Sequence, residues 1–288
     1  RAGRSRCASA WRNHRDPPIR DVIADLRRAS HGRLLALLLS RTADILAAEE
    51  VLSHAYLRAL ETWPERGVPD SPEAWLFTVA RNRWIDLKRR ENKTRRVELD
   101  ETTVAAEEPM PDERLKLLFI CSHPAIAESV RTPLMLQTVL GLEAAAIAAA
   151  FAVKPSAMAQ RLVRAKRKIR DARIPFDVPD DVTERLPFVL EAIYGAFSAE
   201  HLADAPLPSG DLRLEALYLA DLLCRLMPDQ PEALGLSALL GFSYARRRAQ
   251  VVDGVLVPLD EQDVRLWESA GMHRAEPVSY THLRAHET

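Results

Sequence analysis

The sequence is poor in glycine and in cysteine. Of its 288 residues only 10 are glycine and three are cysteine, whereas 47% are hydrophobic and 28% are charged. Scarce glycine, with Ala, Leu, Arg and Glu dominating, predicts a mostly helical chain, and the length suggests two or three small domains. Cys7, Cys121 and Cys224 lie far apart and form no CxxC pair. We therefore expect free thiols in a reducing cytoplasm rather than a disulfide framework.

The sequence also lacks the patterns of an enzyme or a membrane protein. It holds no apolar run long enough to span a bilayer and no visible signal peptide. No carboxylate pair, catalytic triad, phosphate loop or metal motif stands out. Cys121 and His123 are close in sequence, but such neighbours rarely have the geometry of a nucleophile and its base. We expect a cytoplasmic protein that is not an enzyme and has no cofactor, no metal and no membrane partner.

The formal net charge of −1 hides a strong segregation of charge along the chain. Basic residues concentrate at 81–96 and 160–170, whereas residues 97–112 are acidic and contain two prolines. An acidic, proline-containing stretch of this kind predicts a flexible linker between two domains. Two interpretations stay open for it: a segment that repels nucleic acid until a partner places it, or an inert solvated spacer.

Residues 141–173 have the pattern of two helices joined by a tight turn. Leu142, Ile147 and Phe151 make one short apolar face, and residues 152–154 interrupt it. Pro155 suits the first turn of a second helix and Ser156 suits its cap. In that helix four apolar residues recur at helical spacing and predict a buried stripe. They are Met158, Leu162, Ala165 and Ile169.

The other face of this second helix is basic, so the pair of helices predicts a helix-turn-helix whose second helix can lie in a major groove. Gln160 and Arg161 lie near the helix start, where base edges would be within reach. Residues 166–168 lie farther along and suit phosphate oxygens. A solvated basic helix is the alternative. The predicted DNA contacts are Ser156, Gln160, Arg161, Arg164, Lys166, Arg167 and Lys168.

The N-terminal part of the chain predicts a further set of helices. Residues 19–60 have helical periodicity, with Leu34, Leu38 and Ile45 on one face, and residues 48–60 form an amphipathic helix that Trp63 and Pro64 end. Another helix begins at residues 71–73, where a cap, a proline and an acid follow one another. We expect a bend in it at residues 81–83.

The end of that last helix combines cations with an aromatic ring and an amide. The cations suit phosphates, Trp84 offers a stacking platform and Asn82 can bind an unstacked base. A purely structural role for Trp84 in the core is the open alternative. The predicted contacts of this second basic surface are Arg81, Asn82, Arg83, Trp84, Lys88 and Arg89.

These stretches resemble the extracytoplasmic-function sigma factors of bacterial RNA polymerase, within the sigma-70 family. AEEVLSHAYLRAL at 48–60 and WPERGVPDSPEAWLFTVARNRWIDLKRRE at 63–91 are similar to region 2, and MAQRLVRAK at 158–166 is similar to region 4. The resemblance implies that residues 81–90 capture and melt the −10 promoter element and that the basic helix reads the −35 element. It also implies a helix that binds core polymerase, through Glu49, Glu50, His54 and Arg58. Ser53 departs from the Gln usual in the family.

The C-terminal part resembles one subgroup of these proteins, which has a long helical extension related to tetratricopeptide arrays. DERLKLLFICSHPAI at 112–126 and RLPFVLEAIYGAF at 185–197 carry this resemblance. Leu214, Leu217 and residues 220–223 predict an apolar helix face, and residues 227–232 predict the turn into the next helix. Antiparallel helices of this kind can stack as a solenoid.

We therefore expect an all-α protein with four parts: a region 2 helical bundle at 19–96, an acidic linker at 97–111, a region 4 helix-turn-helix at 112–174 and a helical-repeat-like extension at 175–276. The expected function is that of a sigma factor, which binds core RNA polymerase, recognises −35 and −10 promoter DNA and initiates transcription. The extension is expected to bind a regulatory partner. The alternatives are a stand-alone helix-turn-helix regulator with a ligand- or partner-binding C-terminal domain, and a helical scaffold with incidental basic faces.

The two ends of the chain carry expectations of their own. The sequence has no initiator Met, and residues 1–16 are basic and without pattern. We interpret the chain as a fragment whose extension is truncated. Residues 277–288 have no periodicity, and we interpret them as a non-native tail.

Overall fold

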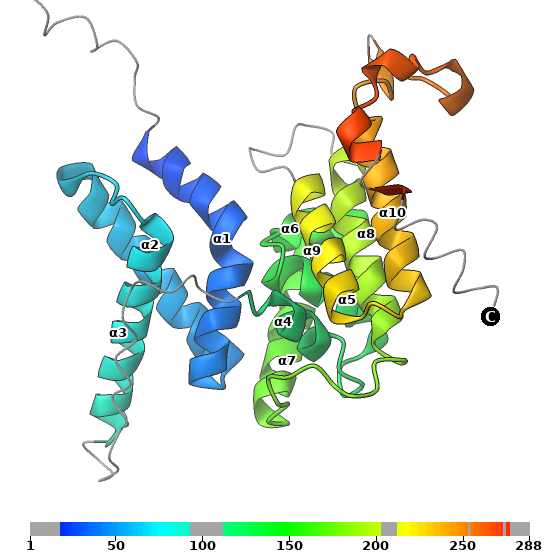
Figure 1. The fold of residues 1–288 in the computed structure, drawn as a ribbon. Helices are drawn as coiled ribbons and strands as arrows, with labels where there is room; N and C mark the ends of the chain where they lie inside the picture. The colour runs from blue at the N-terminus through cyan, green and yellow to red at the C-terminus, as the bar shows by residue number, and fades with distance from the viewer. Residues whose placement is uncertain (1–17, 93–111, 203–211, 253, 273–274, 277–288) are drawn as a thin grey trace, which may run out of the picture.

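The computed structural model describes residues 18–92, 112–202, 212–252, 254–272 and 275–276, and they form an all-α protein as predicted (Figure 1). The acidic linker and the ends of the chain, on which several expectations fall, lie outside these residues. The helices are α1 (Ile19–Thr42), α2 (Ile45–Arg66), α3 (Pro72–Asn92), α4 (Arg114–Cys121), α5 (Glu128–Thr138), α6 (Ala144–Ala150), α7 (Pro155–Asp171), α8 (Leu186–Leu202), α9 (Leu212–Leu226) and α10 (Pro231–Ala245). A short antiparallel hairpin, β1 (Val251–Val252) and β2 (Val255–Leu256), precedes two 3₁₀ turns, η1 (Leu259–Glu261) and η2 (Val264–Leu266).

The first three helices pack on one another as a bundle. Leu34, Leu38 and Ile45 are buried together, as their spacing predicts. The chain turns between α1 and α2 at Ala43, which has a left-handed φ of 52°. Asp44 then caps α2, because its carboxylate accepts hydrogen bonds from the backbone N–H groups of the first turn at 2.9 and 3.3 Å. The junction thus fixes the direction in which α2 leaves α1.

The ends of α2 and α3 can be compared with the sequence prediction. Trp63 and Pro64 do not end α2, which continues to Arg66. Proline is tolerated there because Trp63 is buried in the core and only half a turn of helix follows. Helix α3, in which a bend was predicted at residues 81–83, is one continuous helix from Pro72 to Asn92. The basic end of α3 is therefore a direct extension of its buried first half.

Helices α4 to α7 form a second group, shown in green in Figure 1; α8 and α9 pack directly against it, and α10 packs on α8 and α9. Arg114 of α4 is buried and forms ion pairs with Asp112 and with Glu215 of α9. Burial works to raise the pKa of Asp112, but the hydrogen bonds and charge of Arg114 outweigh it and lower that pKa. Thr132 of α5 also donates a 2.9 Å hydrogen bond to Glu191 of α8. The C-terminal helices are thus joined to α4 and α5 by both polar and apolar contacts.

Within the C-terminal helices, the turn predicted at residues 227–232 lies where α9 ends and α10 begins. The predicted apolar face of α9 is confirmed in part. Ala220 and Leu223 are buried, and Leu217 and Leu222 are partly buried against the core, but Leu214 is 50% exposed. Ala216 and Leu219 complete the buried stripe. Helix α9 contains more leucines than one buried face can accommodate, so periodicity alone also selected Leu214.

Candidate nucleic-acid interface

The turn between α6 and α7 sets the direction of the basic helix. In this turn Val153 donates its N–H to the carbonyl of Ala148 at 2.8 Å, and Ala152 has a left-handed φ of 51°. Helix α7 then begins at Pro155, whose ring fixes a helical φ. The four residues of the predicted stripe are all buried, which confirms that part of the sequence prediction. They are Met158, Leu162, Ala165 and Ile169.

Most of the predicted DNA contacts of α7 point away from this stripe. The exposed ones are Ser156, Gln160, Arg164, Arg167 and Lys168, and Arg161 is partly exposed. The prediction that Ser156 caps the helix is wrong, because the cap residue is Lys154 and Ser156 lies inside the first turn. The Ser156 side chain is exposed to solvent and makes no capping hydrogen bond to the backbone at the helix start.

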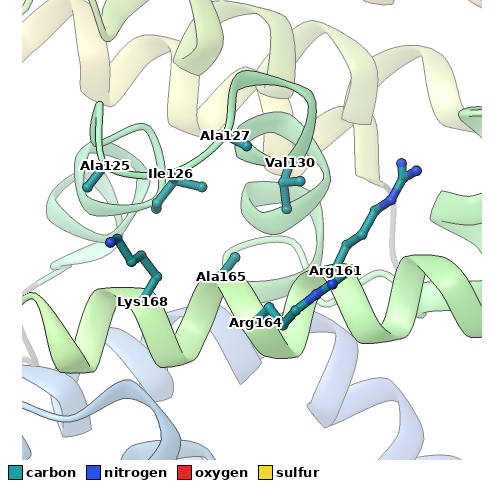
Figure 2. A pocket seen from close by; sticks show the side chains of 8 residues that line it. All are labelled: Ala125, Ile126, Ala127, Val130, Arg161, Arg164, Ala165 and Lys168. Carbon is teal, nitrogen blue, oxygen red and sulfur yellow. The ribbon is translucent and has the colours of Figure 1, made fainter.

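A cleft of about 250 Å³ runs along one flank of α7, between this helix and the segment that leads into α5 (Figure 2). Ile126, Val130 and Ala165 provide its apolar floor. Arg161, Arg164 and Lys168 line it from α7, and Figure 2 shows these long side chains extending from that helix. The flank that carries the cleft is therefore strongly cationic. Sequence spacing alone did not predict the cleft, because its opposite wall comes from the segment that leads into α5.

Lys166 differs from the other cations of α7. Its side chain lies on the opposite flank, is only 8% exposed, and forms an ion pair with Glu49 of α2. The sequence analysis counted Lys166 among the DNA contacts, but in the structure its side chain is buried against Glu49, which is 117 residues away in the sequence. In this arrangement Lys166 is buried between two helices and does not face solvent with the residues of the cleft.

Helix α2 presents a mixed polar and apolar surface beside Glu49. Glu50 and Arg58 are exposed and His54 is partly exposed. Arg58 pairs with Glu61 on the same helix at 2.7 Å. Two large apolar side chains share this surface: Leu57 is 59% exposed and Leu60 is 39% exposed. The sequence analysis missed them, although their positions outside the buried stripe of α2 could have revealed them.

The basic end of α3 places its predicted contacts on more than one side of the helix. Trp84 lies three residues after Arg81, and Lys88 lies four residues after Trp84. The three side chains therefore share one face of α3. Lys88 Nζ lies 4.6 Å from the centre of the Trp84 ring. Asn82 and Arg89 are exposed on the adjacent face, and Arg83 is partly exposed.

Trp84 lies where the core of the bundle meets the cationic surface of α3. Its ring is partly buried and packs against the core of the bundle. It is also covered by the ammonium group of Lys88. One side of the ring is thus anchored, which holds the indole in a fixed orientation at the edge of the cationic surface.

In the described part of the chain, His, Cys, Asp and Glu side chains nowhere gather in groups of three that could hold a metal ion. Cys121 is buried, and burial raises the pKa of its thiol to about 12. None of the helices described is long and apolar enough to cross a membrane.

Comparison with known proteins matches two parts of the chain to protein families. Residues 26–94, which span most of α1 and all of α2 and α3, match sigma-70 region 2. Residues 185–281 match a family of unknown function, DUF6596. The two matches in this order support a sigma-70 family factor.

An uncharacterized protein of Rhizobium meliloti (strain 1021) is 39% identical to this chain over 270 residues. The alignment covers 85% of this chain and 61% of the relative, so the chain spans about three fifths of that protein's length. No solved structure matches the chain.

Proposed function

We propose that the chain acts as a promoter-specificity subunit of bacterial RNA polymerase, of the extracytoplasmic-function type. The observation that carries the proposal is the order of its parts. A bundle that matches sigma-70 region 2 is followed by a helix-turn-helix whose second helix exposes a cationic face. A stand-alone DNA-binding regulator would need only the second part.

In this proposal α7 reads the −35 element. Gln160 and Arg161 lie in the first half of the helix, where side chains of a recognition helix reach base edges. Arg164, Arg167 and Lys168 follow along the exposed side and bind phosphates, which fixes the register of the helix in the groove. Ser156 is exposed at the start of α7, and its hydroxyl can hydrogen-bond to a phosphate of the DNA backbone.

The basic end of α3 acts on the −10 element. A base that leaves the duplex needs an aromatic surface and a polar group for its edge. Trp84 and the exposed amide of Asn82 supply these, and the surrounding cations bind the phosphates of the separated strand.

Helix α2 provides the surface for core polymerase. Exposed leucines beside charged side chains suit a protein-binding surface, because exposed apolar groups can be buried on binding and complementary charges contribute specificity. Glu50, Leu57 and Arg58 would make the central contacts, with His54 and Glu49 at the edges. The C-terminal helices would serve as a platform for a regulatory partner, since they are joined to the DNA-reading part through Arg114.

The test of this function is binding to purified core polymerase in the absence of DNA, followed by run-off transcription from a promoter library. We expect the protein to bind core polymerase and to direct transcription from promoters that share a −35 and a −10 element. Glu50→Lys should weaken binding to core polymerase without changing the circular dichroism spectrum. Asp180→Lys makes the same change of charge at an exposed position away from α2, and should bind normally.

A protein that binds promoter-like DNA but fails to bind core polymerase would identify the chain as a stand-alone regulator instead. Equal binding by the Glu50→Lys variant and the wild type would mean that α2 is not the polymerase-binding surface.

A further inference from the structure

The cleft beside α7 combines two kinds of surface. Its rim carries the cations Arg161, Arg164 and Lys168, and its floor is apolar. DNA phosphates can pair with the cations of the rim, but a phosphate has no apolar group that would cover the floor. A ligand that matches both surfaces must be anionic at one end and apolar at the other.

The three cations of the rim are available to such a ligand. Among the residues that the structure describes, no acidic side chain forms an ion pair with Arg161, Arg164 or Lys168. By contrast, Arg170 of the same helix pairs with Asp171 at 2.8 Å. Like charges that line one cleft repel one another, and an anion bound between them relieves this repulsion.

The cations lie at both ends of the apolar floor. Figure 2 shows Lys168 near Ala125 at one end of the cleft and Arg161 near Val130 at the other end, with Ala165 between them. A flat apolar ring that covers the floor would therefore have its acidic group beside a cation at either end.

Hydrogen bonds hold the wall opposite α7 in place. His123 Nδ1 accepts the N–H of Ala125 at 3.0 Å, and Nε of Arg131 donates to the carbonyl of Ile126 at 3.0 Å. The guanidinium of Arg131 also lies 4.5 Å from the centre of the Phe188 ring of α8. The cleft is therefore formed before a ligand arrives, as small-molecule sites usually are, and little loss of freedom opposes binding.

We propose that this cleft binds a small amphipathic anion, an aromatic ring that carries one carboxylate or phosphate, and that the bound ligand excludes −35 DNA from α7. The ring lies on Ile126 and Ala165, and the acidic group pairs with the cations of the rim. The volume of about 250 Å³ restricts the ligand to about one or two rings. The exclusion of DNA rests on the proposed function, which assigns the same cations to DNA, whereas binding of the anion does not.

Sodium 2-naphthoate is a suitable probe, because it joins a flat apolar ring system to one carboxylate. Isothermal titration calorimetry on the full chain should detect one site. The amide 2-naphthamide has the same rings without the charge, and inorganic phosphate has charge without the rings. Each should bind at least about tenfold more weakly than 2-naphthoate. No binding of 2-naphthoate, or equal affinity for either of the other two compounds, would overturn the site.

Ala127→Leu should fill the cleft without changing a cation or any residue proposed to touch DNA. Ala127 lines the cleft, is exposed and immediately precedes α5, so the fold can accept a larger side chain there. We expect the affinity for 2-naphthoate to fall at least about tenfold, with an unchanged circular dichroism spectrum. Ala270→Leu is the matched control, since it makes the same substitution at an exposed alanine that does not line the cleft. Unchanged affinity in Ala127→Leu would mean that the probe binds elsewhere.

Competition with a −35 duplex tests the exclusion of DNA. At a 2-naphthoate concentration about ten times its Kd, direct competition should raise the apparent Kd of the wild type for the duplex about elevenfold. Sodium acetate at the same concentration is the control, because added salt by itself weakens DNA binding. Ala127→Leu should bind the duplex as the wild type does, and 2-naphthoate should weaken its DNA binding no more than acetate does.

The two assays separate this inference from the proposed function. If the wild type binds both 2-naphthoate and the duplex but the probe weakens DNA binding no more than acetate does, the exclusion of DNA fails. If the chain binds 2-naphthoate but no promoter duplex, the proposed function fails and the anion site stands.

Discussion

The buried imidazole of His31 in α1 predicts that the stability of the protein depends on pH in a specific way. Burial, together with the charges of Arg27 and Lys166, lowers the pKa of His31 from 6.5 to about 4. The ring also stacks on Tyr56, with its centre 6.3 Å away. In the unfolded chain His31 has its ordinary pKa. Between about pH 6.5 and pH 4 the imidazole is therefore protonated in the unfolded state but mostly neutral in the folded state. The free energy of unfolding must therefore fall as the pH falls from about 6.5 towards 4.

The size of the effect follows from the two pKa values. Their difference, from 6.5 to about 4, corresponds to about 3 kcal/mol when the pH has fallen below both values. At pH 5.5 the unfolded imidazole is mostly protonated and the folded one is mostly neutral. The expected loss between pH 7.5 and pH 5.5 is then about 1 kcal/mol from this residue alone.

Urea denaturation, followed by circular dichroism at the two pH values, measures this loss. His31→Leu cannot be protonated, so it should lose about 1 kcal/mol less than the wild type between pH 7.5 and pH 5.5. The pKa of His123 is also lowered by burial, but its contribution is common to both proteins and cancels. His54→Leu makes the same substitution at a partly exposed position and is the matched control. An identical dependence for His31→Leu would refute the reasoning.

Three further predictions concern the DNA surfaces and the C-terminal helices. Trp84→Ala should lose about 1–3 kcal/mol of stacking with melted −10 DNA, and permanganate reactivity of the promoter bubble should fall; an unchanged bubble would contradict this role. Arg161→Ala should cost about 1–3 kcal/mol on the cognate −35 element and relax discrimination at one base pair, whereas Lys168→Ala should weaken all single-base variants alike and reduce the salt slope by about one. Binding at two salt concentrations distinguishes them, and a uniform loss for Arg161→Ala would make it a phosphate contact. Arg114→Met strands two carboxylates and should lower the free energy of unfolding by about 3 kcal/mol, while Arg225→Met, in an exposed ion pair, should change it by less than about 1 kcal/mol; equal losses in urea denaturation would contradict the first value.

Local pattern predicted much of the fold, because the helices carry their own signals. The stripe from Met158 to Ile169 repeats at helical spacing, and it is buried as expected. The turn after α9 was predicted from its two prolines, and it lies at residues 227–230 between the helices. The errors arose where the local signals were ambiguous. Pro64 indicates a helix end, but the burial of Trp63 holds one more half-turn of α2 in place.

The candidate site was less accessible to sequence reasoning, because its geometry depends on residues far apart in the chain. Periodicity placed Lys166 on the edge of α7 but could not identify Glu49 as its neighbour. The cleft beside Arg161 needs the segment before α5 as its second wall. Nor could composition distinguish Gly32 from an ordinary helical glycine, since only the carbonyl oxygen of Val139, 1.9 Å from where a Cβ atom would lie, makes it necessary.

The joint between α8 and α5 has a consequence for how this chain can be divided. The matched C-terminal family begins at residue 185, only one residue before α8 starts. This family boundary lies beside a packed interface between α8 and α5. In that interface Phe188 lies under the guanidinium of Arg131, and Glu191 accepts a hydrogen bond from Thr132. The segment that matches the family is therefore not the same as the unit that packs together in the structure. A gene fusion that moved residues 185–281 to another protein would carry half of an interface with it, and the new host would have to supply a surface equivalent to α5.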